Sequence, residues 1–496
     1  MKPYPFVYEI NAWVWLHELA RREAAPIHLG TVPDREWDTI AELGFDAVWL
    51  MGVWDRSPGG VAVALANPGL VDSFRQALPD YRPEDVVGSP YCIRRYVVDE
   101  RLGGADGLAA ARAALAVRGL DLILDFVPNH VAPDHPWAEA HPDYFVLGDE
   151  EDVARDAASF IRVGGQVLAN GRDPFFPAWP DVVQLNAFSR TLRTAVVETL
   201  LDVAGRCDGV RCDMAMLFLN DVFERTWGER VGPPQAEEYW DVVIGAVSAA
   251  YPDFVFLAEA YWDLEWTLRQ HGFRFCYDKR LYDRLVDEGA DDVRGHLSGD
   301  VAYQEGLVRF VENHDEPRAA ATFTPQKARA AAVATLSQTG ARLVHEGQLE
   351  GRQVRLPVFL GRRPEEPPDE DLRAFYRRLL AALGDDVFRH GAWQLAETRG
   401  WPGDERWRSL VAWTWDGGSR WLVVVNLGDT TAAGLAAVPW DDVRGRDWLL
   451  RDTTNDVELV RGGDDLRDGL YVELPAWRWH FFQLIEHEER GDAREG

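Results

Sequence analysis

Apolar runs alternate with stretches of helical spacing along roughly the first 380 residues of the chain. The runs are mostly apolar at consecutive positions, which is typical of strands in a parallel sheet that is covered on both faces. Stretches between them, such as 108–119 and 189–205, have the apolar spacing of helices. Eight strand–helix units predict an α/β fold, a (β/α)8 TIM barrel. The eight runs occupy residues 8–16, 45–54, 120–130, 209–215, 254–262, 273–278, 307–317 and 341–347.

Two long connections interrupt this alternation, one at residues 55–90 and one at 131–186. Loops of this length inside a compact domain are usually functional or form a small subdomain, and in a barrel they lie over the face that carries active sites. The pattern changes again near residue 386, where short runs at 409–418, 420–429 and 469–485 are separated by turn residues. These runs predict a C-terminal antiparallel β-sandwich.

The predicted organisation therefore has four parts. We expect the barrel over residues 1–130 and 187–385, with an inserted subdomain at 131–186 after the third strand. The β-domain follows at 386–487, and residues 488–496 form a charged tail.

The charge of the chain narrows the classes of partner. It carries 52 Lys and Arg against 82 Asp and Glu, a formal net charge of −30. Such a field repels nucleic acid and anionic membranes, so we expect neither as a partner. The four cysteines show neither a paired motif nor metal-ligand spacing, and the N-terminal stretch lacks the features of a signal peptide. We therefore expect reduced thiols and a cytoplasmic location.

Ionisable residues end four of the eight apolar runs. A carboxylate beside apolar residues is costly to bury unless it is paired or solvated. Any one of these groups has an ordinary structural explanation, such as a loop cap or an ion pair. Four of them at the end of a barrel that carries chemistry indicate an active site. The four segments are Asp125–His130, Arg211–Asp213, Ala258–Ala260 and Asn313–Asp315.

Three carboxylates with an arginine fit the cleavage of a glycosidic bond with retention of configuration. That reaction needs an ionised nucleophile and a protonated acid. Arg211 and Asp213 are two residues apart and share one face of a strand, so the guanidinium can hold Asp213 as an anion. The apolar setting of Glu259 favours its protonated form. Asp315 can stabilise a cationic transition state, and the histidines at 130 and 314 can bind hydroxyls.

The motifs that carry these residues resemble those of glycoside hydrolase family 13, the α-amylase family. They are DFVPNH at 125–130, GVRCD at 209–213, FLAEA at 256–260 and FVENHDEPR at 310–318, together with the segment GSPYCIRRYVVDERLGG at 88–104, which contains Tyr91. The resemblance implies catalysis by Asp213 as nucleophile, Glu259 as general acid/base and Asp315 as transition-state stabiliser. It also implies a set of substrate-binding residues. These are Tyr91, Asp125, His130, Arg211 and His314.

Other positions carry open alternatives. Trp262 is interpreted either as a stacking residue for the leaving group or as core. Arg318 is interpreted either as an anchor for Asp315 or a substrate hydroxyl, or as a partner of surface acids. The chemistry requires no cofactor. The family's structural calcium stays an open question, because Asn129 and an uncertain Asp181 are too few oxygen ligands.

The predicted function is that of a retaining α-glycosidase acting on α-glucosidic bonds of small glucosides or oligosaccharides. Met216 and Leu217 stand where amylases often have Lys-His, which disfavours a typical starch-degrading amylase. The alternatives are a transglycosidase or disaccharide isomerase, similar to trehalose synthase or sucrose-active enzymes, and a starch- or maltooligosaccharide-degrading α-amylase. A non-catalytic carbohydrate-binding protein on the same fold is the hypothesis from another class.

Overall fold

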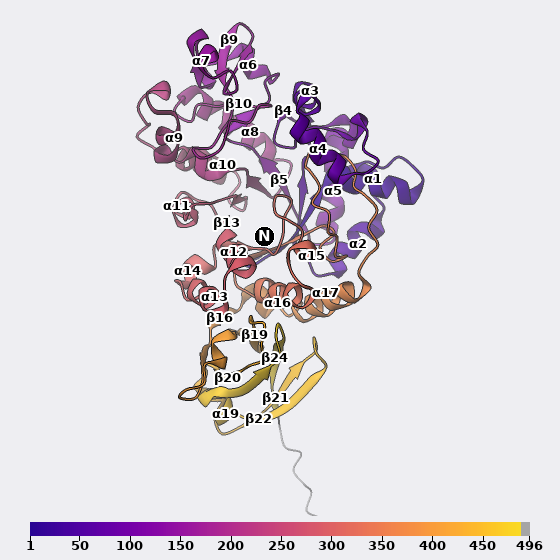
Figure 1. Cartoon of the computed structure of the whole chain (residues 1–496), viewed down its shortest axis with the longest axis vertical. Coiled ribbons are helices and arrows are strands. Elements are labelled where there is room, and N and C mark those ends of the chain that lie inside the picture. Colours follow the sequence, from indigo (N-terminus) through magenta and orange to yellow (C-terminus); the bar gives the residue numbers. More distant parts are fainter. Residues whose placement is uncertain (488–496) are drawn as a thin grey trace, which may run out of the picture.

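A closed barrel of eight parallel strands forms the centre of the molecule in the computed structural model, which describes residues 1–487 (Figure 1). Its strands are almost entirely buried, as their consecutive apolar residues predict. The predicted TIM barrel is thus confirmed. The strands, in the order of the chain, are β1 Phe6–Asn11, β2 Ala47–Met51, β5 Asp121–Phe126, β11 Gly209–Cys212, β12 Val255–Ala258, β13 Phe275–Tyr277, β14 Leu307–Arg309 and β15 Ala341–His345.

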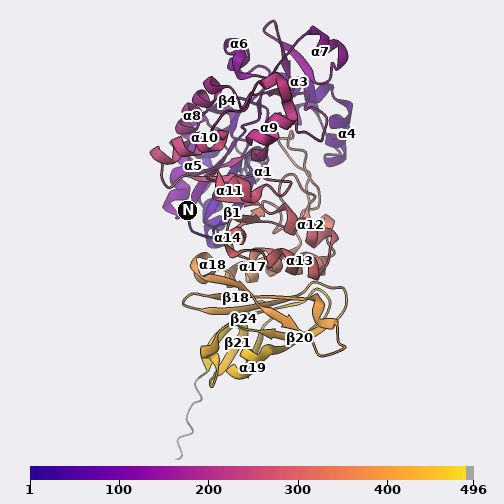
Figure 2. The ribbon, with the colours of Figure 1, turned by 90° about the vertical axis from the view of Figure 1, so that its left-hand side faces the viewer.

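Helices surround the barrel on its outer side (Figures 1 and 2). The predicted helices 108–119 and 189–205 correspond to α5 and α8. The hydroxyl of Ser189 accepts from the N–H of Leu192 and caps the start of α8. The principal helices are α2 Asp34–Glu42, α5 Gly104–Val117, α8 Arg190–Ala204, α10 Tyr239–Ala250, α12 Lys279–Asp287, α16 Pro325–Leu336 and α17 Glu370–Ala382.

The predicted first strand is shorter than its apolar run. β1 ends at Asn11, whose side chain accepts from the N–H of Val14 and caps helix α1, Ala12–Glu23. Residues 12–16 are therefore helical, and our extension of the strand to residue 16 was wrong. An apolar run alone does not distinguish a buried strand from the buried side of a helix.

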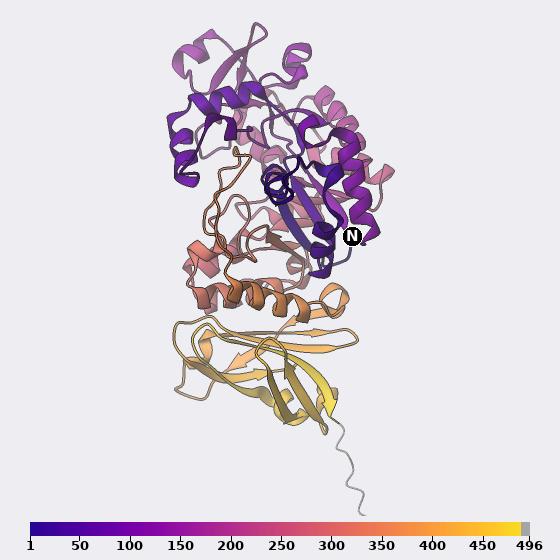
Figure 3. The same ribbon diagram turned by 90° about the vertical axis from the view of Figure 1, so that its right-hand side faces the viewer.

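Both long connections contain secondary structure. The first holds the short strand β3, Trp54–Arg56, and a pair of helices, α3 Pro58–Ala66 and α4 Pro68–Ala77. The second holds a three-stranded sheet, and its strand β10, Val183–Gln184, pairs with β6, His130–Val131. Figure 3 shows both at the end of the barrel opposite the C-terminal domain. The strands of the small sheet are β7 Leu147–Gly148, β8 Phe160–Val163 and β9 Gln166–Ala169.

The chain ends in two antiparallel sheets that lie beyond α17 (Figure 3). The predicted runs at 409–418 and 420–429 are β18 Leu410–Asp416 and β19 Arg420–Asn426. The run at 469–485 contains two strands, β23 Leu470–Leu474 and β24 Trp479–His487, which belong to different sheets. The predicted antiparallel β-domain is confirmed, whereas the charged tail at 488–496 lies outside the described residues. The remaining strands are β16 Ala392–Leu395, β17 Glu397–Arg399, β20 Ala432–Ala437, β21 Asp447–Asp452 and β22 Val457–Gly462.

The four cysteines are buried and unpaired. Within residues 1–487, none of the helices combines the length and the apolar character that crossing a bilayer requires.

Candidate active site

Three carboxylates meet at one end of the barrel, where they surround the guanidinium of Arg211. This side chain is 1% exposed. Its Nη1 donates to Asp213 Oδ1 at 2.7 Å, and its Nη2 lies 2.8 Å from Glu259 Oε2 and 3.8 Å from Asp315 Oδ2. One cation therefore binds two buried acids directly and lies near a third.

These acids line a pocket of about 270 Å³. Tyr91 and His130, both predicted from the sequence, also line it. A second pocket, of about 480 Å³, adjoins the first at Asp315 and Phe359. Helix α4 and residues 354–359 form its sides, so the long connection after β2 contributes directly to the site.

Glu259 lies directly after β12 and has the setting of a general acid. Its Oε1 accepts from the hydroxyl of Tyr261 at 2.8 Å, and its Oε2 accepts from the N–H of Met214 at 2.7 Å. Burial raises the pKa of Glu259 to about 7, helped by the charges of Asp213 and Asp315 and opposed by Arg211. The group therefore keeps a substantial protonated fraction at neutral pH.

Asp213 follows β11, and its environment differs from the one predicted. Burial raises its pKa above the ordinary value, although Arg211 opposes this rise through its charge and its hydrogen bond. The arginine contact predicted from the two-residue spacing is present, but it only partly offsets burial. The chain turns sharply after Asp213, because Met214 has a left-handed backbone with φ 44° and lines the pocket.

Asp315 is the most exposed of the three carboxylates, at 37% of its side chain. Burial alone would raise its pKa, but the neighbouring His314 and then Arg211 outweigh that effect and hold it well below the usual range. The Nε2 atom of His314 is 2.9 Å from Asp315 Oδ2. Asp315 thus stays ionised and faces the pocket.

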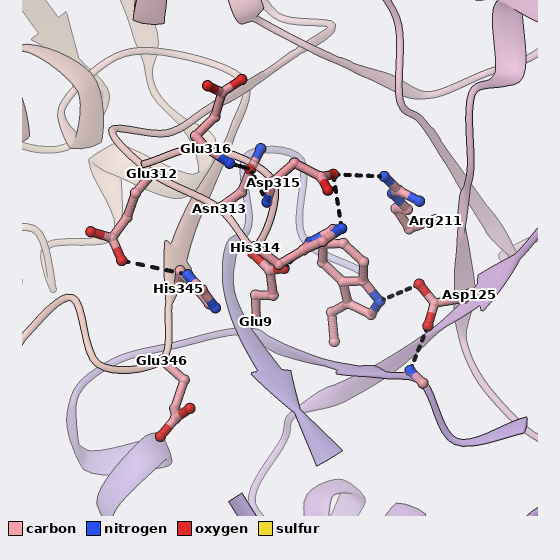
Figure 4. A network of polar contacts seen from close by, with 12 residues as sticks. Glu9, Asp125, Arg211, Glu312, Asn313, His314, Asp315, Glu316, His345 and Glu346 are labelled. Atoms are coloured by element: carbon pink, nitrogen blue, oxygen red, sulfur yellow. Dashed lines mark hydrogen bonds and ion pairs between the residues drawn. The ribbon is translucent and has the colours of Figure 1, made fainter. Parts of the chain in front are cut away.

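His314 is the bridge between this pocket and the barrel interior (Figure 4). Its Nδ1 contacts Glu9 Oε1, and its Nε2 also contacts the hydroxyl of Tyr91. Burial would lower the pKa of His314, but Asp315 and Glu9 outweigh this effect and raise it to about 10. His314 is therefore an imidazolium at neutral pH. By contrast, burial lowers the pKa of His130 to about 3, so that histidine is neutral.

Asp125 lies beneath the pocket rather than in its lining. It is fully buried, accepts from Trp49 Nε1 at 3.1 Å and from the N–H of Gly52 at 2.8 Å, and is paired in register with Arg211. Gly52 has φ 78°, and a Cβ there would meet the side chain of Arg56. Burial raises the pKa of Asp125 to about 6, against the opposing charge of Arg211. Both oxygens of Asp125 accept hydrogen bonds from the protein itself, so the structure assigns Asp125 to the support of the pocket and not to its lining.

The structure does not bring Trp262 and Arg318 to this pocket. Trp262 packs edge-on against Phe175 with ring centroids 4.9 Å apart. Arg318 donates to Glu312 Oε1 at 2.6 Å and to the carbonyl of Glu346 at 2.9 Å. Of the two interpretations that the sequence left open for Arg318, its contacts match an ion pair, but the partner Glu312 is buried and not on the surface. Met216 and Leu217 are also buried away from the pocket, in a short helical turn, η5 Ala215–Phe218.

Several residues in or beside the pocket were missed from the sequence. Trp179 lines the pocket from the connection at 131–186 and Phe359 from the segment between β15 and α17, where no periodic pattern identifies a contact with the barrel. Tyr261 follows Glu259 by two residues, and this spacing could have indicated a shared face. Glu9 is an acid within an apolar strand, and that alone could have marked it for attention.

The residues around Asn129 do not fit a calcium site. Its Oδ1 accepts from Gln184 Nε2 at 2.9 Å, and the same nitrogen donates to the carbonyls of Asn129 and Leu185. An amide nitrogen thus lies among the oxygens that a cation would need. Within residues 1–487, no cluster of three or more His, Cys, Asp or Glu residues has the geometry to hold a metal ion.

Comparison with known proteins agrees with this geometry. The α-amylase MalA of Haloarcula japonica is 24% identical over 393 residues, which are 76% of this chain and 48% of that protein. The trehalose synthase/amylase TreS of Mycobacterium tuberculosis is 26% identical over 242 residues, 45% of this chain and 34% of that protein. The chain thus spans half or less of the length of these relatives. No model of a known protein family matches it.

Among solved structures, the maltogenic α-amylase AmyB of Thermotoga neapolitana aligns with a TM-score of 0.68 at 18% identity, covering 98% of this chain and 99% of that one. This likeness shows the fold, a (β/α)8 barrel with a C-terminal β-domain. Together with the sequence relatives, it indicates glycoside hydrolase family 13, the α-amylase family.

Proposed function

We propose that this protein is a retaining α-glycosidase that cleaves α-glucosidic bonds of small glucosides or oligosaccharides. The observation that carries the proposal is the shared contact of Arg211 with Asp213 and Glu259 beside an ionised Asp315. A retaining enzyme needs two carboxyl groups close together on either side of the bond, about 5–5.5 Å apart. A single guanidinium that binds both groups supports this arrangement.

The proposed reaction has two steps. Glu259 protonates the leaving oxygen while Asp213 attacks the anomeric carbon, which forms a glycosyl-enzyme bond and releases the alcohol. Glu259, now ionised, takes a proton from water as the water attacks the same carbon and frees Asp213. The pKa of about 7 for Glu259 suits both roles. Asp315 stabilises the positive charge that develops on the sugar in both steps.

The shape of the site supports a short substrate. Helix α4 and residues 354–359 line the space beside Asp315, and Trp179 lines the first pocket next to the His130 ring. Two adjoining pockets of about 270 and 480 Å³ favour a mono-, di- or oligosaccharide over a long polysaccharide.

The experiment is product analysis with p-nitrophenyl α-glucoside, maltose, trehalose, sucrose and maltooligosaccharides. We expect the first glucose released to be the α-anomer, which proton NMR distinguishes from the β-anomer. Asp213→Asn serves as the blank, and Asp202→Asn is the control, because that carboxylate is exposed on α8. Full turnover by Asp213→Asn, or a β-anomer as first product, would refute the proposal.

A second function, transfer of the glycosyl group to another sugar, uses the same residues. The observation that favours it is the similarity to a protein named trehalose synthase/amylase. Only the fate of the intermediate differs, and this depends on how well water is excluded. Rearranged disaccharides in the maltose, trehalose or sucrose incubations would support transfer, whereas glucose alone from maltose or trehalose would support hydrolysis.

A further inference from the structure

Glu9 lies in the interior of the barrel, on strand β1, and is fully buried. Its Oε1 contacts Nδ1 of His314, while Nε2 of that ring faces Asp315 Oδ2 at 2.9 Å (Figure 4). One imidazole thus connects a carboxylate in the barrel to a carboxylate in the pocket. A ring with an anionic acceptor at each nitrogen must donate from both, and only the imidazolium can do so.

The position of Glu9 is not explained by stability alone. Within the described part of the chain, its second oxygen, Oε2, has no hydrogen-bond partner. Leaving a buried charged oxygen unpaired is costly, and an apolar residue would avoid that cost. The contact with His314 is the feature that such a residue could not provide.

Strand β15, which lies beside β1, places a second histidine next to Glu9. The register pairs Glu9 with His345 on β15, and His345 Nδ1 lies 3.5 Å from Glu312 Oε1. Glu312 in turn binds Arg318. The carboxylate of Glu9 therefore lies between two histidines, and the one nearer the pocket bridges it to Asp315.

Ionisable groups face His314 or its carboxylate partners from every element packed around them. Tyr91 contacts its ring, and Arg211 lies 5.2 Å from the Tyr91 ring and 3.8 Å from Asp315. Arg355 lines the adjoining pocket and acts on the charge of Asp315. These groups are Glu9 and His345 from β1 and β15, Asp125 and Arg211 from β5 and β11, Tyr277 from β13, Asp213 and Glu259 directly after β11 and β12, and Tyr91, Asp315, Glu316 and Arg355 from loops.

We propose that Glu9 is a positioning residue that holds His314 as a doubly donating imidazolium and thereby keeps Asp315 ionised and directed at the sugar. This role rests on the proposed glycosidase function. Glu9 does not touch the substrate. It acts through His314, which would otherwise lose its proton in so buried a place.

The electrostatics agree in direction for all three groups. Burial would raise the pKa of Glu9, but His345 and His314 outweigh it and lower that pKa. The pKa of His314 is raised and that of Asp315 is lowered, each against the effect of burial. Removing the charge of Glu9 should therefore lower the pKa of His314 and raise that of Asp315.

The first test follows the ring nitrogens of His314 by 15N NMR as the pH is raised, with the signal assigned by its loss in His314→Gln. In the wild-type protein we expect both nitrogens to stay protonated at pH 8. Glu9→Gln keeps an acceptor oxygen but removes the charge, so the pKa of His314 should fall by about 1–3 units in this variant. Glu265→Gln is the control, since it removes a buried carboxylate on α11, Glu265–Gln270.

The second test is kinetic. We expect Glu9→Gln to lose at least about tenfold in kcat/KM, because a misplaced pocket group is costly. The loss should grow between pH 6 and pH 9 as His314 loses its proton. A loss that is equal at every pH, or a neutral His314 in the wild type at pH 8, would overturn the role of Glu9. If Glu9→Gln does not fold, Glu9→Asp and the wild-type titration decide the question.

The two proposals fail in different ways. A wild-type protein that turns over none of the α-glucosides refutes the glycosidase function. An unchanged His314 titration in Glu9→Gln refutes the positioning role, whatever the activity.

Discussion

The hydrogen bond from Tyr261 to Glu259 leads to a specific prediction for Tyr261→Phe. The hydroxyl donates to Oε1 at 2.8 Å, and this donor favours the ionised form of the carboxyl group. Phenylalanine keeps the ring and removes the donor. We therefore expect the pKa of Glu259 to rise above its value of about 7.

The size of this rise follows from the energy of the bond. A hydrogen bond to a charged group contributes about 1.5–3 kcal/mol. One pKa unit corresponds to about 1.4 kcal/mol, so losing the bond should raise the pKa by about 1–2 units. Glu259 is only 4% exposed, and solvent can therefore replace little of the missing donor. The pKa in the variant should lie at about 8–9.

The assay is the pH dependence of kcat/KM for p-nitrophenyl α-glucoside, which reports the ionisation of the free enzyme. Because Glu259 must be protonated to act as the acid, the alkaline limb should move up by the same 1–2 units. Tyr251→Phe is the control, since that tyrosine lies on the surface at 38% exposure. An alkaline limb that stays in place or moves down in Tyr261→Phe would refute the assignment of Glu259 as the acid.

Three further predictions concern stability and binding. The pKa of Glu259 is above its ordinary value, so the folded protein should lose about 3 kcal/mol of unfolding free energy as the pH rises from 4.5 to 7. Glu259→Gln should remove that loss. Urea titrations measure the unfolding free energy at each pH, and equal pH profiles for the two proteins would contradict this. EDTA should leave the Tm unchanged, and a Tm that EDTA lowers and Ca²⁺ restores would show a metal site. Gln184→Ala should lower the free energy of unfolding by about 1–3 kcal/mol, because it removes the hydrogen bonds to Asn129. Trp179→Ala should raise KM about 2- to 10-fold with little change in kcat, because Trp179 lines the pocket. The control is Trp401→Ala, since Trp401 is exposed. An unchanged KM in Trp179→Ala would show that Trp179 does not belong to the substrate site.

The barrel could be predicted because its cause is local. A strand that is covered on both faces must be apolar at consecutive positions, and eight such runs are visible without knowledge of their partners. Strand ends were less certain, because they depend on single contacts. β1 stops where the side chain of Asn11 caps the next helix, although the apolar run continues.

The candidate site divides in the same way. Asp213 and Glu259 stood out because each follows an apolar run at the end of the barrel that carries chemistry. Trp179 and Phe359 did not, because they reach the pocket from long connections whose path depends on tertiary packing. Glu9 was visible as an isolated acid, but its partner His314 is 305 residues away.

Arg211 shows why contacts between residues are harder to predict from the sequence than the site residues themselves. The two-residue spacing predicted its contact with Asp213, and that contact is present at 2.7 Å. The contact with Glu259 arises from the parallel register of β11 and β12, which the sequence does not specify. That second contact changes the chemistry, because one guanidinium must then serve an acid that keeps its proton and a nucleophile that loses it. Burial and the charges of Asp213 and Asp315 favour the proton on Glu259, against the charge of Arg211. Once Glu259 is protonated, Arg211 has one anion fewer to balance, and its charge and hydrogen bond favour the ionised form of Asp213 that the proposed first step needs.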